Sequence, residues 1–219
     1  MRALVTGGTG RVGMAVSERL RAQGWSVLAA GRADGDLAAA AAAQTLVARA
    51  VDELGGLDLL VNAAGEGFVP KPVGDVTEAD WHAAFGATAK GSFFVTQAAA
   101  PHLSESRGLV VMIEDVAAYQ PWPSFAPHSA AKAAQAMLTR VFARALAPEV
   151  RVCGIALGPV AVEPGQEERR AAETLLGRVG TPADVADAVV YLLGAEFVTG
   201  TSLVVDGGRI LQTERRPGA

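Results

Sequence analysis

Short apolar runs alternate with helix-length segments along all 219 residues of the chain. This alternation is typical of βαβ units, in which helices connect parallel strands and cover the sheet. It predicts strands at residues 3–5, 25–30, 57–61, 109–113, 150–157 and 202–205, and helices at about 11–23, 38–54, 77–102, 129–147 and 182–194. Thr181 followed by Pro182 is the pattern of a helix N-terminus. The chain is therefore predicted to fold as a doubly wound α/β domain with a parallel sheet.

One strand–helix unit of this pattern is shortened. Only one helix fits between Arg32 and Leu57, so residues 35–37 are expected to form a stub after the second strand. The polar residues 212–219 are predicted to be a flexible tail. A single domain over residues 1–211 is the resulting expectation.

Composition excludes several classes of function. The chain has 19 Lys and Arg residues and 23 Asp and Glu residues, which gives a net charge of −4. A negative net charge argues against broad binding to nucleic-acid phosphates. No apolar run reaches the ~18 residues of a membrane span, and no long apolar leader opens the chain. Cys153 is expected to be buried, and the histidines are too scattered for a metal site. We expect a soluble, cytoplasmic protein with a small-molecule substrate, no membrane or nucleic-acid partner and no metal.

A glycine-rich turn lies directly between the first strand and the first helix, at Thr6–Gly13. Glycines in such a turn let backbone amides approach a pyrophosphate at the helix N-terminus. The turn predicts a dinucleotide-binding Rossmann fold. Its candidate cofactor-binding residues are Gly7, Thr9, Gly10, Arg11, Val12 and Gly13.

The end of the second strand distinguishes the two nicotinamide cofactors. An acidic residue there would bind the ribose 2′-hydroxyl of NAD, whereas an arginine suits the extra phosphate of NADP. This chain has Gly31-Arg32 at that point. Arg32 therefore favours NADP(H), with a solvated loop arginine as the alternative.

Further segments resemble the short-chain dehydrogenase/reductase family between about residues 3 and 210. Leu60–Gly65 is similar to the Asn-Asn-Ala-Gly segment of that family, and Phe85–Phe93, Gly108–Val116 and Val150–Val160 follow in the family's order. The resemblance implies further cofactor contacts at Asp36, Leu37, Asn62, Ala63, Ala64, Gly65, Lys132, Gly158, Pro159 and Val160. It also implies a homotetramer or homodimer built through the helices at 77–102 and 129–147.

Within this family the motifs are most similar to those of bacterial pteridine reductases. Arg11 replaces the middle glycine of the turn, and Phe68–Pro72 resembles the Phe-x-Pro-x-Pro segment whose phenyl ring stacks on the pterin. Trp122 and Phe125 are candidates for a wall of the substrate pocket, with core packing as the alternative. The stretch Glu163–Arg170 is either a mobile substrate lid or a solvated helix start.

The family's catalytic residues are only partly present. Its Tyr-x-x-x-Lys pair falls on His128 and Lys132, its serine on Asp115 and its helix asparagine on Thr88. Asp is found at the serine position in pteridine reductases, which also use it with an arginine to protonate the pterin, here Asp115 with Arg11. A cap at the end of a strand is the alternative role of Asp115, and a packed histidine that of His128.

His128 is a candidate acid because an imidazole exchanges its proton near neutral pH. A neighbouring Asp115 would favour its charged form, whereas Lys132 and an oxidised nicotinamide would oppose it. Two functions remain open on these residues. The first is an NADPH-dependent reductase of a carbonyl or imine, with a pterin-like heterocycle as candidate substrate. The second is a degenerate NADP(H)-binding protein that acts as a sensor or partner subunit, and a sugar-nucleotide epimerase is a weaker third.

Overall fold

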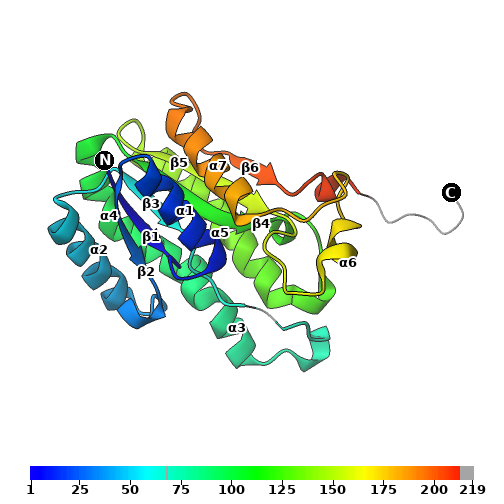
Figure 1. The fold of residues 1–219 in the computed structure, drawn as a ribbon. Helices are drawn as coiled ribbons and strands as arrows, with labels where there is room; N and C mark the ends of the chain where they lie inside the picture. Colours follow the sequence, from blue (N-terminus) through cyan, green and yellow to red (C-terminus); the bar gives the residue numbers. More distant parts are fainter. Residues whose placement is uncertain (68, 213–219) are drawn as a thin grey trace, which may run out of the picture.

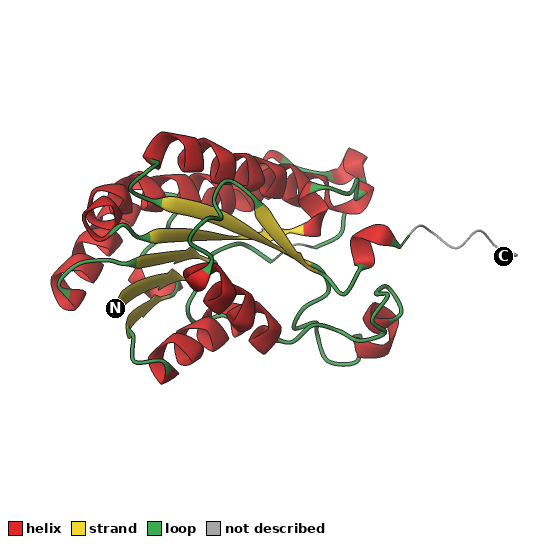
Figure 2. Ribbon diagram, turned by 90° about the horizontal axis from the view of Figure 1, so that it is seen from above, coloured by secondary structure: helices red, strands yellow, loops and turns green. Residues whose placement is uncertain are grey.

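The computed structural model describes residues 1–67 and 69–212. Six parallel strands form one sheet in the order β2-β1-β3-β4-β5-β6. Their bounds are Arg2–Thr6 (β1), Ser26–Ala30 (β2), Leu59–Asn62 (β3), Leu109–Asp115 (β4), Arg151–Leu157 (β5) and Ser202–Val205 (β6). Helices cover both faces of the sheet, which confirms the predicted doubly wound fold (Figure 1, Figure 2).

Two apolar layers hold the helices against the sheet. The helices are α1 (Arg11–Ala22), α2 (Ala40–Leu54), α3 (Glu78–Phe85), α4 (Ser92–Ser106), α5 (Ala126–Leu146), α6 (Glu167–Ala171) and α7 (Pro182–Gly194). On one face, Val16 and Leu20 of α1 and Val189 of α7 are buried against the strands. On the other face, α2, α4 and α5 form a second buried cluster with the sheet. Among the described residues, no helix has both the length and the apolar character that crossing a bilayer requires.

The helix predicted at 77–102 is present but is not α-helical throughout. A π-helical segment at Gly86–Gly91 joins α3 to α4. A Cβ atom on Gly86 would lie 3.1 Å from the Cβ of Ala38, and one on Gly91 would lie 3.1 Å from the Cβ of Leu37. The two glycines thus let this segment pack closely against the turn before α2, a tertiary contact that helical periodicity does not reveal.

Helix starts agree with the sequence where the capping residues are strong. Thr181 and Asp184 form a reciprocal capping box at α7, with Pro182 in the first turn, so the predicted start is confirmed. By contrast, α5 begins at Ala126, three residues before the predicted position, because Pro127 is accommodated in its first turn.

The shortened unit after β2 is present in the fold. Residues 32–34 form a single 3-10 turn, and the chain then enters α2 without a further strand. The chain runs from β1 outward to β2 and then returns to β3 on the other side of β1. The carboxyl ends of β1 and β3, where Thr6 pairs with Asn62, therefore form the switch point at which such sheets bind ligands.

Candidate active site

A cavity of ≈ 490 Å³ lies at this switch point. Its walls are formed by the turn after β1, the end of β2, the stub before α2 and the segment after β3. The predicted cofactor-binding residues among them are Gly7, Thr9, Gly10, Arg32, Asp36, Leu37, Ala63, Ala64 and Gly65. The structure thus brings together residues that are up to about sixty positions apart in the sequence.

The glycines of the turn make this cavity accessible to a pyrophosphate. Gly7 has φ +65°, and a Cβ on it would lie 2.5 Å from the carbonyl oxygen of Ala63. A Cβ on Gly13 would lie 2.3 Å from the carbonyl oxygen of Gly7. Gly10 at the N-cap has no side chain to cap the first turn of α1, and no acidic residue lies in that turn, so the described residues leave its amides available for an anion. This geometry fits a nicotinamide dinucleotide.

Arg32 lies at the edge of the cavity with its side chain 83% exposed, in an ion pair of 2.7 Å with Glu66. The acidic residue of the same turn, Asp34, is bound to other groups. Asp34 accepts hydrogen bonds from the backbone N–H of Gly31 and from Arg49, and these hold the pKa of Asp34 below its usual value. Asp36 accepts a hydrogen bond from the N–H of Ala38 and shapes the turn before α2.

His128 and Asp115 lie together at the carboxyl end of β4. Nε2 of His128 is 3.4 Å from Oδ2 of Asp115, and His128 is only 7% exposed. The other carboxylate oxygen, Oδ1, accepts a hydrogen bond of 2.7 Å from the N–H of Ala117. Asp115 therefore both caps the turn after β4, as its alternative role predicted, and faces the histidine.

Lys132 lies one helical turn beyond His128 on α5 and is 8% exposed. Its Nζ donates to the carbonyl oxygen of Ile113 at 2.7 Å and to Oε1 of Gln135 at 3.1 Å. Burial lowers the pKa of Lys132, whereas the charges of Asp115 and Glu114 oppose that decrease. Among the described groups these two acceptors use two of its three N–H donors.

Two other positions implied by the family resemblance lie deeper. Thr88 sits in the π-helical segment and is 2% exposed, with Oγ1 at 3.4 Å from the Cβ position of Gly65. Asn62 is enclosed within the sheet and donates to Oγ1 of Thr96 at 3.0 Å. Val12 packs against the core beneath α1. The side chains of Asn62 and Val12 therefore do not line the cofactor cavity.

A second, larger cavity of ≈ 730 Å³ adjoins Asp115 and the loop after β5. Arg11, Trp122, Gly158, Pro159 and Val160 line this cavity and not the one at the glycine turn. The guanidinium of Arg11 donates to the carbonyl oxygen of Val162 at 2.9 Å and pairs with Glu163. Arg11 and Asp115 thus share a cavity, but the direct partner of Arg11 is the loop before α6.

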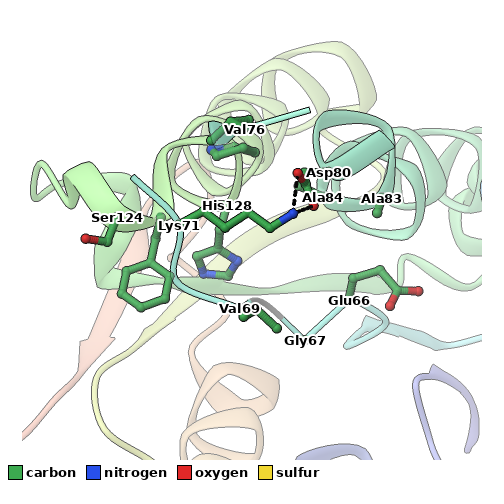
Figure 3. Close-up of a pocket in the computed structure, with 12 residues that line it drawn as sticks. Glu66, Gly67, Val69, Lys71, Val76, Asp80, Ala83, Ala84, Ser124 and His128 are labelled. Atoms are coloured by element: carbon green, nitrogen blue, oxygen red, sulfur yellow. Dashed lines mark hydrogen bonds and ion pairs between the residues drawn. The ribbon is translucent and has the colours of Figure 1, made fainter. Parts of the chain in front are cut away.

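A smaller cavity of ≈ 270 Å³ is lined by His128 (Figure 3). The segment that carries Val69 and Lys71 crosses it, and the backbone N–H of Lys71 donates to the carbonyl oxygen of Ser124. Nζ of Lys71 is bound to both carboxylate oxygens of Asp80. Phe68, the predicted pterin-stacking residue, lies outside the described residues.

Sequence reasoning missed four charged residues around the larger cavity. Arg169, Arg170 and Arg209 surround Glu173, and all three arginines line the cavity. The stretch Glu163–Arg170, predicted to be a lid or a helix start, includes most of α6, whose last turn carries Arg169 and Arg170. The run of charges in the sequence pointed only to Arg169 and Arg170, because Arg209 comes from a distant part of the chain.

The remaining candidates have ordinary environments. Cys153 is buried as predicted, and burial raises the pKa of its thiol. His82 contacts Glu78 one helical turn away on the exposed side of α3. In the part of the chain that the structure describes, no three residues of the His, Cys, Asp and Glu types form a metal-binding group.

Comparisons with known proteins agree with this architecture. The family model described as enoyl-(acyl carrier protein) reductase matches residues 11–209. The 3beta-hydroxysteroid dehydrogenase 1 of Eggerthella lenta is 34% identical in an alignment of 243 positions, which covers 95% of this chain and 93% of that protein. Human dehydrogenase/reductase SDR family member 4 is 30% identical in an alignment of 239 positions, which covers 94% of this chain and 86% of that protein.

Solved structures give the same result. The gluconate 5-dehydrogenase of Burkholderia cenocepacia, in complex with NADP and tartrate, superimposes with a TM-score of 0.86 at 25% identity. The match covers 97% of this chain and 96% of that one. The fold, the glycine cradle and these matches together show that the chain belongs to the short-chain dehydrogenase/reductase family of NAD(P)-dependent oxidoreductases.

Proposed function

We propose that this protein is an NADPH-dependent reductase of a carbonyl or imine with an altered proton donor. The observation that carries this proposal is the hydrogen-bonded pair of His128 and Asp115 at the carboxyl end of β4. The pair lies at the same edge of the sheet as the glycine cradle and beside the buried Lys132.

The proton donor follows from the arrangement of these side chains. Bound NADPH would supply a hydride to the carbon of the carbonyl or imine, so this chain must protonate the oxygen or nitrogen. The proton between Nε2 of His128 and Oδ2 of Asp115 is the one that we assign to this step. Lys132 would use its remaining N–H donor to hold a ribose hydroxyl.

Arg32 supports NADPH over NADH. Its guanidinium is exposed at the mouth of the cofactor cavity, where a 2′-phosphate would compete with Glu66 for it. An exposed ion pair contributes only about 0–1 kcal/mol, so a doubly charged phosphate could displace it. Because the phosphate must displace Glu66 from Arg32, we expect the preference for NADPH over NADH to be moderate.

A pterin-like heterocycle is the narrower candidate substrate within this proposal. The proposal is supported by Asp115 and Arg11, which line one cavity, and by Trp122, which supplies an aromatic wall.

Homo-oligomerisation through α5 also belongs to the proposal, since Met137 and Val141 are exposed apolar residues on that helix. A cytoplasmic location rests on the single cysteine, Cys153, because disulfides are rare in that compartment.

A second function is favoured by one specific observation. The tyrosine and asparagine positions of the family hold His128 and Thr88, while the glycine cradle is intact. A degenerate protein that binds NADP(H) without turnover would show the same combination. Such a protein would act as a sensor or a partner subunit.

The experiment that separates the two functions compares the natural protein with His128→Tyr. NADPH consumption is followed with a quinonoid dihydropterin and with a panel of aromatic aldehydes, beside measured NADPH binding in the same sample. If the natural site works with histidine, the natural protein should turn over substrate and His128→Tyr should be slower. Turnover near zero that rises strongly in the variant would instead identify a decayed site.

A further inference from the structure

Three arginines surround one carboxylate at the outer end of the larger cavity. Arg170 donates to both oxygens of Glu173, at 3.0 and 2.7 Å, and Arg209 lies 3.2 Å from Oε2 of the same group. Arg169 adds a third contact of 3.2 Å. Three guanidinium groups thus share one carboxylate at this end of the cavity.

Arg209 is the most buried of the three, with a side chain 16% exposed. Its guanidinium carbon lies 4.4 Å from the centroid of the Trp122 ring, within the range of a cation–π contact. Asp206 holds the turn that presents it, by accepting hydrogen bonds from the N–H groups of Gly208 and Ile210 at 2.7 Å. Arg209 is therefore fixed in place.

One end of this fixed guanidinium lacks a partner. Nη1 of Arg209 is buried and has no hydrogen-bond partner within the described residues. A buried N–H group of a charged side chain that remains unpaired is unfavourable, so such an atom indicates a missing acceptor. Within the described residues, Glu173 already forms an ion pair with Nη2 of Arg209 and accepts from Arg170, so Nη1 is the atom that a carboxylate of a ligand would bind.

The position of the cluster separates it from the cofactor. Arg169, Arg170 and Arg209 all line the larger cavity, and none of them is among the described residues around the glycine cradle. Asp115 lines the same cavity and contributes to the electrostatic environment of Arg209. A ligand in this cavity can therefore reach from Asp115, the member of the proton-donating pair that lines it, to the arginines.

We infer that the substrate carries an anionic group, of the carboxylate type, which Arg209 and Arg170 bind while Trp122 contacts its apolar body. Arginine suits this role because its planar fork matches a carboxylate and stays charged at all working pH values. The inference rests on the proposed reductase function for the identity of the reacting group, but the anion site itself is independent of turnover.

The test uses two aldehydes of nearly equal size and different charge, 4-formylbenzoate and 4-formylbenzamide. Their dissociation constants are measured by calorimetry on the whole protein saturated with NADP⁺. The natural protein is expected to bind the carboxylate at least tenfold more tightly than the amide, a difference of about 1.4 kcal/mol. Arg209→Gln should remove this discrimination, and Arg170→Gln should reduce it.

Arg144→Gln is the matched control, since Arg144 is an exposed arginine on α5 away from the cavity. It should retain the full discrimination. If Arg209→Gln does not fold, Arg170→Gln and the comparison of the two aldehydes in the natural protein still decide the question. Equal affinities, no measurable binding of the carboxylate, or discrimination that survives both substitutions would overturn the inference.

Failure of the proposed function has a different signature. Discrimination between the two aldehydes without any NADPH oxidation would leave the anion site standing and remove the reductase assignment. Turnover of both aldehydes with equal affinity for the two would support the reductase function and remove the anion site.

Discussion

Oδ2 of Asp115 faces Nε2 of His128 at 3.4 Å, while Oδ1 of the same carboxylate caps the N–H of Ala117. One side chain thus serves the fold with one oxygen and the candidate proton donor with the other. The pair joins the end of β4 to the start of α5, thirteen residues apart in the sequence.

Substitutions of Asp115 should separate these two roles. Asp115→Asn keeps an oxygen for the cap but loses the charge that faces His128, so turnover should fall by about 10²-fold with stability retained. Asp115→Ala also loses the cap and should lower the free energy of unfolding by roughly 1 kcal/mol. Steady-state kinetics and urea unfolding measure the two effects. Full activity in Asp115→Asn would show that the carboxylate has no part in proton transfer.

The glycine cradle predicts loss of cofactor binding in Gly13→Ala. The added Cβ would lie 2.3 Å from the carbonyl oxygen of Gly7, so the turn must move away from the position that approaches the pyrophosphate. We expect NADPH binding, followed by fluorescence titration, to weaken at least tenfold. Gly194→Ala, near the end of α7 with no atom within 4 Å of its Cβ position, is the control and should bind normally. Unchanged binding in Gly13→Ala would exclude this turn as the pyrophosphate site.

Arg32 and Glu66 predict opposite shifts in cofactor preference. Arg32→Gln removes the positive charge and should weaken NADPH binding by about tenfold with little effect on NADH. Glu66→Gln removes the competing carboxylate and should strengthen NADPH binding. The ratio of the two dissociation constants is the measured quantity. A ratio that does not change in either variant would mean that the extra phosphate lies elsewhere.

The capping box of α7 predicts a pH-dependent contribution to stability. Arg178, and then the N–H of Thr181, hold the pKa of Asp184 well below its usual value. A depressed carboxyl pKa stabilises the fold above the unfolded value of about 4, and this contribution is lost as the pH falls through the folded pKa. Asp184→Asn should therefore lower the free energy of unfolding by about 1 kcal/mol at pH 7.

The difference between Asp184→Asn and the natural protein should shrink progressively below pH 4, as measured by urea unfolding across pH. Asp187→Asn, an exposed acid on the same helix that pairs with Arg19, is the control and should change stability by less than about 0.5 kcal/mol. A pH-independent difference for Asp184→Asn would contradict the role of its charge.

Features that depend on local pattern could be predicted from the sequence. The buried parallel strands are near-continuous apolar runs, and Thr181-Pro182 marks a helix start wherever the helix packs. The glycine turn likewise follows from the strand before it and the helix after it. The elements differed from the prediction where packing decided them, as at the π-helical segment between α3 and α4, where Gly86 and Gly91 pack against the turn before α2.

The parts of the site that could not be predicted are contacts between distant segments. Nothing near Arg11 in the sequence indicates Glu163 as its partner, and nothing near Arg209 indicates Trp122 or Glu173. Long charged side chains choose partners only after the backbone is placed, so sequence spacing carries little information about them. The pairing of His128 with Asp115 was predictable only through the family resemblance.

Hydride transfer from NADPH to an organic carbonyl or imine is the reaction that we propose for this chain. It is measured most directly by mass spectrometry of the alcohols formed from the aromatic aldehydes with NADPH deuterated at C4 of the nicotinamide. We expect one deuterium on the reduced carbon with one of the two C4 epimers, and far less product in Asp115→Asn. Saturable NADPH binding without any transfer of deuterium would identify a binding protein instead of a reductase.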